Sequence, residues 1–134
     1  MAVLVASAGQ VPAAIITTLF SSNNLGDLGG AVYFDINVLN PGEITIEKIF
    51  TNSLDTILGG MNIYTRSGTS IGFQTSLAGW TLVSSGTGTL AGVNSPSEFN
   101  VTDFSLGFGV TGIAIDASSS WGHNYTDGTA SNQF

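Results

Sequence analysis

The chain has 134 residues, with 2 Lys or Arg against 9 Asp or Glu, a formal net charge of −7 and no cysteine. Two cations cannot neutralise a phosphate backbone, which argues against a nucleic-acid partner, and the lack of cysteine excludes disulfides, thiol catalysis and zinc–thiolate sites. Gly, Ser, Thr and Asn accompany β-branched and aromatic residues, a composition that favours strands and tight turns over helices.

The first predicted strands lie near the N-terminus. "AVLVASA" (Ala2 to Ala8) is apolar and ends at Gly9, and "AAIITTLF" (13–20) follows Pro12. No apolar run approaches the roughly 18 residues of a membrane-spanning helix. The Ala-Ser-Ala sequence resembles a signal-peptidase site, but it has no basic region before it, so we expect residues 2–8 in the mature chain. On this interpretation any signal peptide was removed before this numbering begins.

The clearest strand is "GAVYFDINVL" (30–39), which predicts one buried face. That face carries Val32, Phe34, Ile36 and Val38. Asn40-Pro41-Gly42 then predicts a turn. Further strands are expected over residues 43–50, 61–66, 80–86, 97–106 and 110–118, and a short one over 122–128. In the strand over 43–50, Ile44 and Ile46 are expected to face inward.

Short strands separated by glycine turns predict an antiparallel β-sandwich or jelly roll. We expect one domain over residues 11–134, preceded by a strand extension over residues 1–10. The sequence leaves open whether that extension pairs with its own domain or with a neighbouring subunit.

The aromatic residues of the C-terminal segment are the first candidates for a binding site. Trp80, Trp121, His123 and Tyr125 form a candidate glycan contact, because aromatic rings stack on pyranose rings. The alternative, which we favour, is a loop whose Trp and Tyr cover the end of the sandwich, with His123 bonded to backbone.

Catalytic and metal sites have little support in this sequence. The single histidine cannot supply a zinc site, and no serine lies in a G-x-S-x-G pattern. The carboxylates have no calcium-loop spacing, although Asp27 or Asp127 can be proposed as a loop ligand. We therefore expect no enzyme, no cofactor and no metal.

A set of segments, in order, resembles a known family. It comprises a Thr-Leu-Phe strand, an Asn-rich turn, "GGAVYFD", "WTLV", an F-x-L entry to a "GIA" strand, and "HNYTDGT", between Thr17 and Gln133. This pattern is similar to the β-sandwich domain of exported bacterial surface proteins, many of which carry a PEP-CTERM sorting tail. The resemblance implies an extracellular, surface or matrix role with no established active site.

The chain departs from that family at its C-terminus. The family's domains continue into a further strand of the type N-A-x-L-T-L, whereas here a run of similar pattern lies at residues 1–14. A sandwich without its last strand presents unpaired backbone groups and an apolar groove. Ala2, Val3, Leu4, Val5, Ala6, Ser7 and Ala8 are therefore a candidate donor strand, with the acceptor edge expected near residues 122–134.

The leading hypothesis is a secreted, non-enzymatic subunit of a surface filament, pilus-like or matrix fibre, which assembles head-to-tail with itself by donor-strand complementation. The alternative is a monomeric carbohydrate-binding or adhesion module whose partner is an extracellular polysaccharide. A hydrolase is a third hypothesis, which would need carboxylates converging in a cleft. Neither nucleic acid nor membrane insertion is expected.

Overall fold

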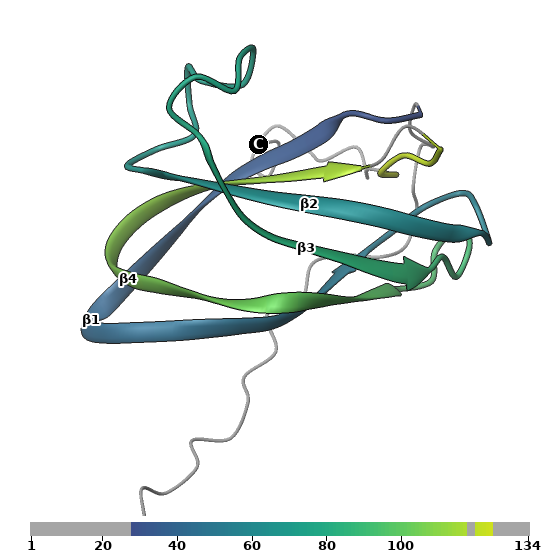
Figure 1. Cartoon of the computed structure of the whole chain (residues 1–134), viewed down its shortest axis with the longest axis horizontal. Coiled ribbons are helices and arrows are strands. Elements are labelled where there is room, and N and C mark those ends of the chain that lie inside the picture. The colour runs from purple at the N-terminus through teal and green to yellow at the C-terminus, as the bar shows by residue number, and fades with distance from the viewer. Residues whose placement is uncertain (1–27, 118–119, 125–134) are drawn as a thin grey trace, which may run out of the picture.

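The computed structural model describes residues 28–117 and 120–124 (Figure 1). Within these ranges the chain forms four strands: β1 (Ala31–Thr51), β2 (Leu58–Ser67), β3 (Thr81–Thr89) and β4 (Ser97–Ala117). All their pairings are antiparallel, which confirms the predicted all-β class. Nowhere in this part of the chain is there a helix with the length and apolar character needed to cross a membrane.

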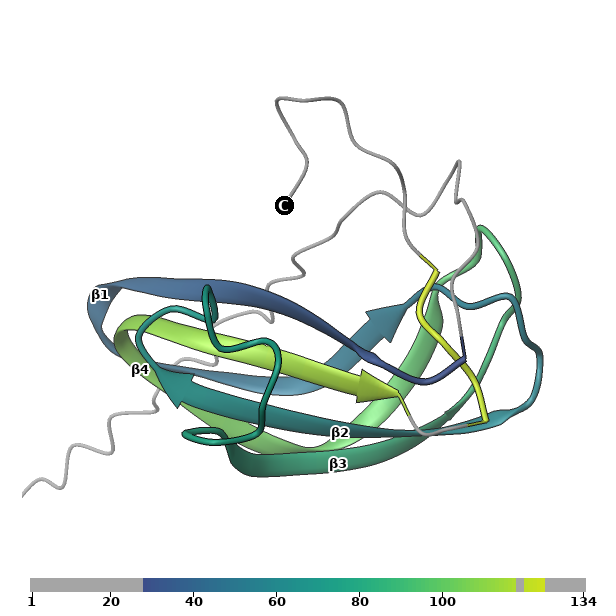
Figure 2. The ribbon, with the colours of Figure 1, turned by 90° about the horizontal axis from the view of Figure 1, so that it is seen from above.

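The four strands form one sheet in the order β1-β4-β2-β3, with an additional pairing between β4 and β3. The last part of β4 lies between β1 and β2, whereas its first part pairs with β1 and, at Val101 and Asn100, with β3. The sheet therefore folds over itself into two sandwich-like layers, as Figure 2 shows from above. One side of this sandwich is closed by β3, and the opposite side is bounded by β1 in both layers.

The two layers are joined where β1 and β4 bend together. The β1–β4 register changes from Val38–Gly109 to Glu43–Gly107, so residues 39–42 form a bulge. The prediction that a turn at Asn40-Pro41-Gly42 separates two strands is therefore wrong, because β1 continues through these residues. Likewise, the two strands predicted at 97–106 and 110–118 form the single strand β4. A bulge beside glycine lets both strands bend sharply without losing their pairing, and Gly109 adopts a φ of 103° that other residues rarely take.

The core lies between the two layers and receives side chains from all four strands. Its buried apolar residues are Val38, Met61, Ile63, Leu90, Phe99, Val101, Leu106, Ile113, Ile115, Ala117 and Trp121. Ile44 and Ile46 pack against this cluster, as predicted. Val32 and Phe34 share the predicted face with Val38, yet they are 38% and 40% exposed.

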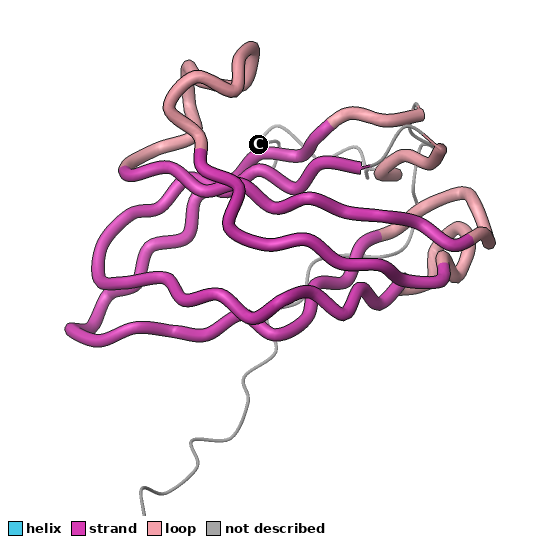
Figure 3. The backbone as a smooth tube through the Cα atoms, in the orientation of Figure 1, coloured by secondary structure: helices cyan, strands magenta, loops and turns pink. Residues whose placement is uncertain are grey.

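A loop over residues 68–80 connects β2 to β3 and protrudes from the upper layer (Figure 3). Gly68 at its start donates a backbone hydrogen bond to the Val110 carbonyl (3.1 Å). Its backbone is then held by Asp35 of β1, whose carboxylate accepts hydrogen bonds from the Thr69 hydroxyl (2.6 Å) and the Ser70 amide (2.7 Å). The loop is thus anchored to the outer face of the upper layer.

Candidate functional site

The candidate site is the outer edge of β1, because β1 pairs only with β4 among the described strands. The Ala117 amide donates to the Gly30 carbonyl, which fixes the alternation of hydrogen bonds along this pair. The amides of Val32, Phe34 and Ile36 therefore point toward β4, and those of the residues between them point away. The outward amides of Tyr33, Asp35 and Asn37 find no strand partner in the described part of the chain.

The inner face beside this edge is apolar and incompletely covered. Val32 and Phe34 are the exposed inner-face residues of the upper layer, and a hollow lined by residues 36–44 lies at the bend. In the lower layer the inner-face residues of β1, Ile44, Ile46 and Ile49, are only partly buried. The inner-face side chains along both halves of β1 are therefore apolar and only partly covered.

The two halves of β1 differ as edges. From Ala31 to Val38 the register with β4 is uninterrupted, and Asp35 is the one charged residue. The second half carries Glu43, Glu47 and Lys48 and has a further register shift between Ile46 and Lys48. Bulges and charges discourage the addition of another strand. The first half is therefore the part of β1 that can accept one.

Asp35 lies on this first half, but its carboxylate is already engaged by the loop over residues 68–80. Desolvation opposes ionisation of Asp35, yet hydrogen bonds from Thr69 and Ser70, with the charge of Arg66, outweigh it and lower its pKa. The side chain stays ionised and turned toward the loop, while its backbone amide remains available at the edge.

Trp80, predicted as a glycan contact, lies in a cluster that supports the same loop. Its ring packs at 5.6 Å from that of Tyr33, and its Nε1 donates to the Phe73 carbonyl (2.9 Å). The Arg66 guanidinium lies 3.3 Å from the centroid of the Phe73 ring and 5.9 Å from that of Trp80. Trp80 is half-buried in these contacts and holds the loop against β1.

Trp121, the second predicted glycan contact, fills the end of the core and is 0% exposed. Its ring stacks on Phe99 with centroids 5.1 Å apart, and its Nε1 donates to the Gly60 carbonyl (2.8 Å). Its own carbonyl accepts from Gly29 (2.7 Å). The ring therefore presents no face to a ligand, and this part of the tail covers the end of the sandwich.

His123 lies beside Trp121 and is also buried, at 8% exposure. Its ring packs edge-on against Trp121, and its Nδ1 lies 2.8 Å from the Thr51 hydroxyl. Its Nε2 has no hydrogen-bond partner among the described residues. Desolvation lowers the pKa of His123 to about 4, with the Ile115 backbone acting in the opposite direction. The neutral ring is thus a structural group.

The remaining predicted site residues fall partly outside the described chain. Ala2 to Ala8, Tyr125, and both Asp27 and Asp127 lie outside the described residues. Of the predicted acceptor edge, residues 122–124 are described, and they form a single bridge between Gly122 and Gly29 in place of a strand. The edge of β1 was not predicted as the acceptor. The two strand patterns at 30–39 and 43–50 are separated by only three residues, a spacing that a hairpin turn also fits, so the sequence carried no specific signal for this edge.

The described ranges give little support for a metal site. They contain no group of three or more His, Cys, Asp or Glu side chains that could hold a metal ion. Comparison with models of known families, with curated proteins and with solved structures finds no match to this chain. The geometry of the β1 edge is therefore the basis for a functional proposal.

Proposed function

We propose that this protein is a non-enzymatic structural subunit that assembles with itself, by strand addition, into an extracellular filament or matrix fibre. The observation that carries the proposal is the first half of β1, where outward-pointing amides adjoin the exposed inner-face residues Val32 and Phe34. An incoming strand would pair with those amides and cover both side chains. Backbone pairing with burial of alternate side chains is how β-augmentation achieves both affinity and register.

The proposed donor is Ala2 to Ala8 of a neighbouring copy. This run carries no charge and is rich in Val, Leu and Ala, and its seven residues are one fewer than the eight of the uninterrupted stretch Ala31 to Val38. A donor at one end of the chain and an acceptor on β1 make a head-to-tail contact. Such a contact generates an open fibre unless the rotation between subunits closes a ring.

The distribution of edge charge supports the same acceptor. Natural sheets protect exposed edges with bulges, proline and charged side chains. Here those features lie at Pro41 and in the second half of β1, and the first half carries only Asp35, whose carboxylate is engaged by Thr69 and Ser70. Protection of one half alone is consistent with selection for one strand addition at a defined place.

The test is negative-stain electron microscopy and light scattering of the full chain and three variants. Asn37→Pro removes an outward amide without removing a bond to β4, and we expect it to abolish filaments. Asn37→Ala removes the same side chain but keeps the amide, so it should assemble normally. Deletion of residues 1–10 should give monomers, and an added peptide of residues 1–10 should bind them.

The outcomes separate the donor from the acceptor. Normal filaments from Asn37→Pro, with unchanged thermal stability, would overturn the acceptor edge. Normal filaments from the deletion would overturn the donor. A wild-type chain that stays monomeric across the concentration range tested would overturn the function itself.

A further inference from the structure

A polar hollow lies on the outer surface where β2, β3 and the first part of β4 meet, away from the β1 edge. Two of its lining residues, Gly60 and Gly86, have no side chain. At Gly86 the backbones approach so closely that an added Cβ would lie 2.3 Å from the Asn100 carbonyl oxygen and 2.9 Å from the Val101 Cα. Gly60 shares the outer face with Asn62 and adds no side chain there, whereas the missing side chain at Gly86, on the face of Met61, lets β3 and β4 approach closely.

The side chains around this hollow are uncharged hydrogen-bonding groups. They are Asn62, Ser85, Thr87, Asn100 and Thr102. Ser85, Thr87, Asn100 and Thr102 are exposed. Within the described part of the chain none of these five side chains makes a hydrogen bond to another residue. They can therefore donate to or accept from a ligand without first breaking an internal bond.

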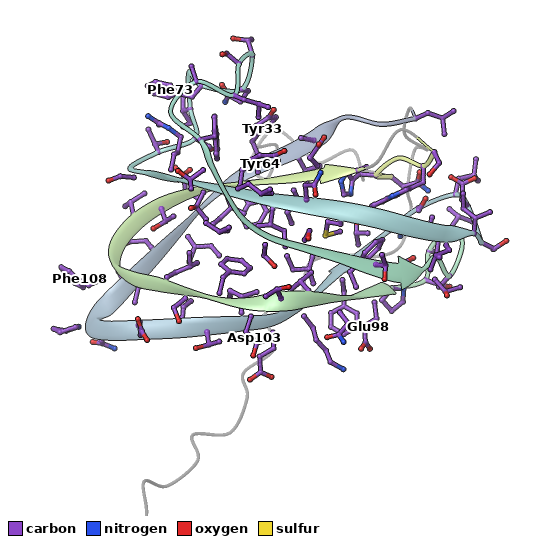
Figure 4. The ribbon with its side chains drawn as sticks, in the orientation of Figure 1. Tyr33, Tyr64, Phe73, Glu98, Asp103 and Phe108 are labelled. Atoms are coloured by element: carbon purple, nitrogen blue, oxygen red, sulfur yellow. The ribbon has the colours of Figure 1, made fainter. Side chains whose placement is uncertain are left out.

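An aromatic surface adjoins the hollow along β2. Tyr64 follows Asn62 by two residues, so the two side chains share the outer face. Ala114 of β4 lies between Tyr64 and Tyr33 in the cross-strand register, which places the two tyrosines two strands apart, about 10 Å. Figure 4 shows both on the same side of the upper layer, near Phe73 and the loop over residues 68–80.

The charges at the rim are few. Asp116 pairs with Asn62 across β2 and β4, and desolvation raises its pKa. Lys48 pairs with Asn100 on the other side, and its ammonium already bonds Glu98 at 2.6 Å. This surface therefore offers no unengaged cation to an anionic ligand. The net charge of the chain, −7, also disfavours an anion.

We propose that this surface binds a segment of uncharged polysaccharide. The hydroxyl groups of one sugar would bond the amides and hydroxyls of the hollow, and the C–H face of a neighbouring sugar would pack on Tyr64. The hollow is open at the surface, which suits an internal stretch of chain. Tyr33 extends the aromatic surface, and Trp80 is a positioning residue because it packs on Tyr33.

The experiment is affinity electrophoresis of the full chain in native gels. The gels contain laminarin, hydroxyethylcellulose, galactomannan or soluble starch as neutral probes, and alginate as the anionic probe, each compared with a gel without polysaccharide. We expect retardation by at least one neutral probe and none by alginate. Tyr64→Ala and Asn100→Ala should each weaken that binding by about tenfold, consistent with loss of one stacking or hydrogen-bonding contact.

Matched variants separate binding from folding. Tyr64→Phe keeps the ring and should bind normally, and Phe108→Ala, an exposed aromatic residue at the bend between the layers (Figure 4), should also bind normally. Thermal midpoints within a few degrees of wild type identify variants that remain folded. The proposal is overturned if no neutral probe retards the chain, if alginate retards it most, or if folded Tyr64→Ala and Asn100→Ala bind like wild type. Filament formation by the β1 edge is a separate readout.

Discussion

Gly59 of β2 lies directly against the indole of Trp121, so the glycine makes room for the ring. A Cβ added at Gly59 would lie 2.9 Å from the indole Nε1 and 3.0 Å from its Cδ1. The neighbouring Gly60 carbonyl accepts the indole hydrogen bond (2.8 Å). The Gly59-Gly60 pair therefore provides both the space and the acceptor that hold Trp121 at the end of the core.

We expect Gly59→Ala to destabilise the protein by about 1–3 kcal/mol, because a methyl group forced into a filled site displaces a buried ring. Gly107→Ala is the matched control, since a Cβ there meets no atom within 4 Å. It should leave stability unchanged or raise it slightly. Chemical denaturation followed by tryptophan fluorescence measures both. Equal effects of the two substitutions would contradict the close packing at Gly59.

Burial of neutral His123 makes stability depend on pH. Its pKa is about 4 in the folded protein, against the ordinary value of 6.5. Between these values the unfolded chain binds a proton that the native chain does not, so stability falls as pH decreases from about 7 to 4. The full difference corresponds to about 3 kcal/mol. Denaturation midpoints at pH 7, 6, 5 and 4 should show this decline.

Comparison with His123→Phe isolates the contribution of this one histidine. The pKa of Asp116 is raised, so acidification favours the native state there, whereas the lowered pKa of Asp35 makes its contribution fall at more acidic pH. The contributions of Asp116 and Asp35 are the same in both proteins, so they cancel when the free energy of unfolding of the variant is subtracted from that of wild type at each pH. The variant should lose the decline between pH 7 and 4, and parallel profiles for the two proteins would refute the role of His123.

Much of the fold could be predicted because the strands alternate in a sequence of low charge. The segments around residues 30–39, 61–66 and 80–86 are strands in the structure, and Ile44 and Ile46 face the core. The continuity of β1 through residues 40–42 was not predicted, because Asn-Pro-Gly is typical of a turn, whereas here it belongs to a bulge. Local sequence does not distinguish the two cases, since a bulge depends on a partner strand, here β4, that bends with it.

The candidate site was harder to predict than the fold. Alternation places Val32 and Phe34 on the buried face, but their exposure depends on which strand lies beside β1, a question of topology. The aromatic residues of the tail suggested a ligand site, whereas Trp121 and His123 are buried against Phe99 and Thr51. Tyr64 and Asn62 belong to no recognisable binding motif in the sequence. Their neighbours across the sheet, Ala114 and Asp116, follow only from the register of β2 with β4.

The loop over residues 68–80 should depend on the planar guanidinium of Arg66, which stacks on Phe73 and donates to the Thr69 carbonyl. Arg66→Lys keeps the charge but loses the stacked, branched donor. We expect amides of the loop to exchange about tenfold faster and the protein to lose about 1 kcal/mol. Lys48→Ala, at an exposed ion pair, is the control and should change neither quantity. Unchanged loop exchange in Arg66→Lys would contradict this role.

The charges of the second half of β1 should act against association. Glu47 and Lys48 adjoin the register shift at Ile46, and both are exposed on a strand whose outer edge has no partner among the described strands. Replacing both by Thr keeps the strand propensity and removes the charges. In an Asn37→Pro background, where the first half is blocked, the double variant should scatter light at lower protein concentration than its parent. If scattering is unchanged, the bulge alone protects this half, and edge charge does not explain why assembly would use Ala31 to Val38.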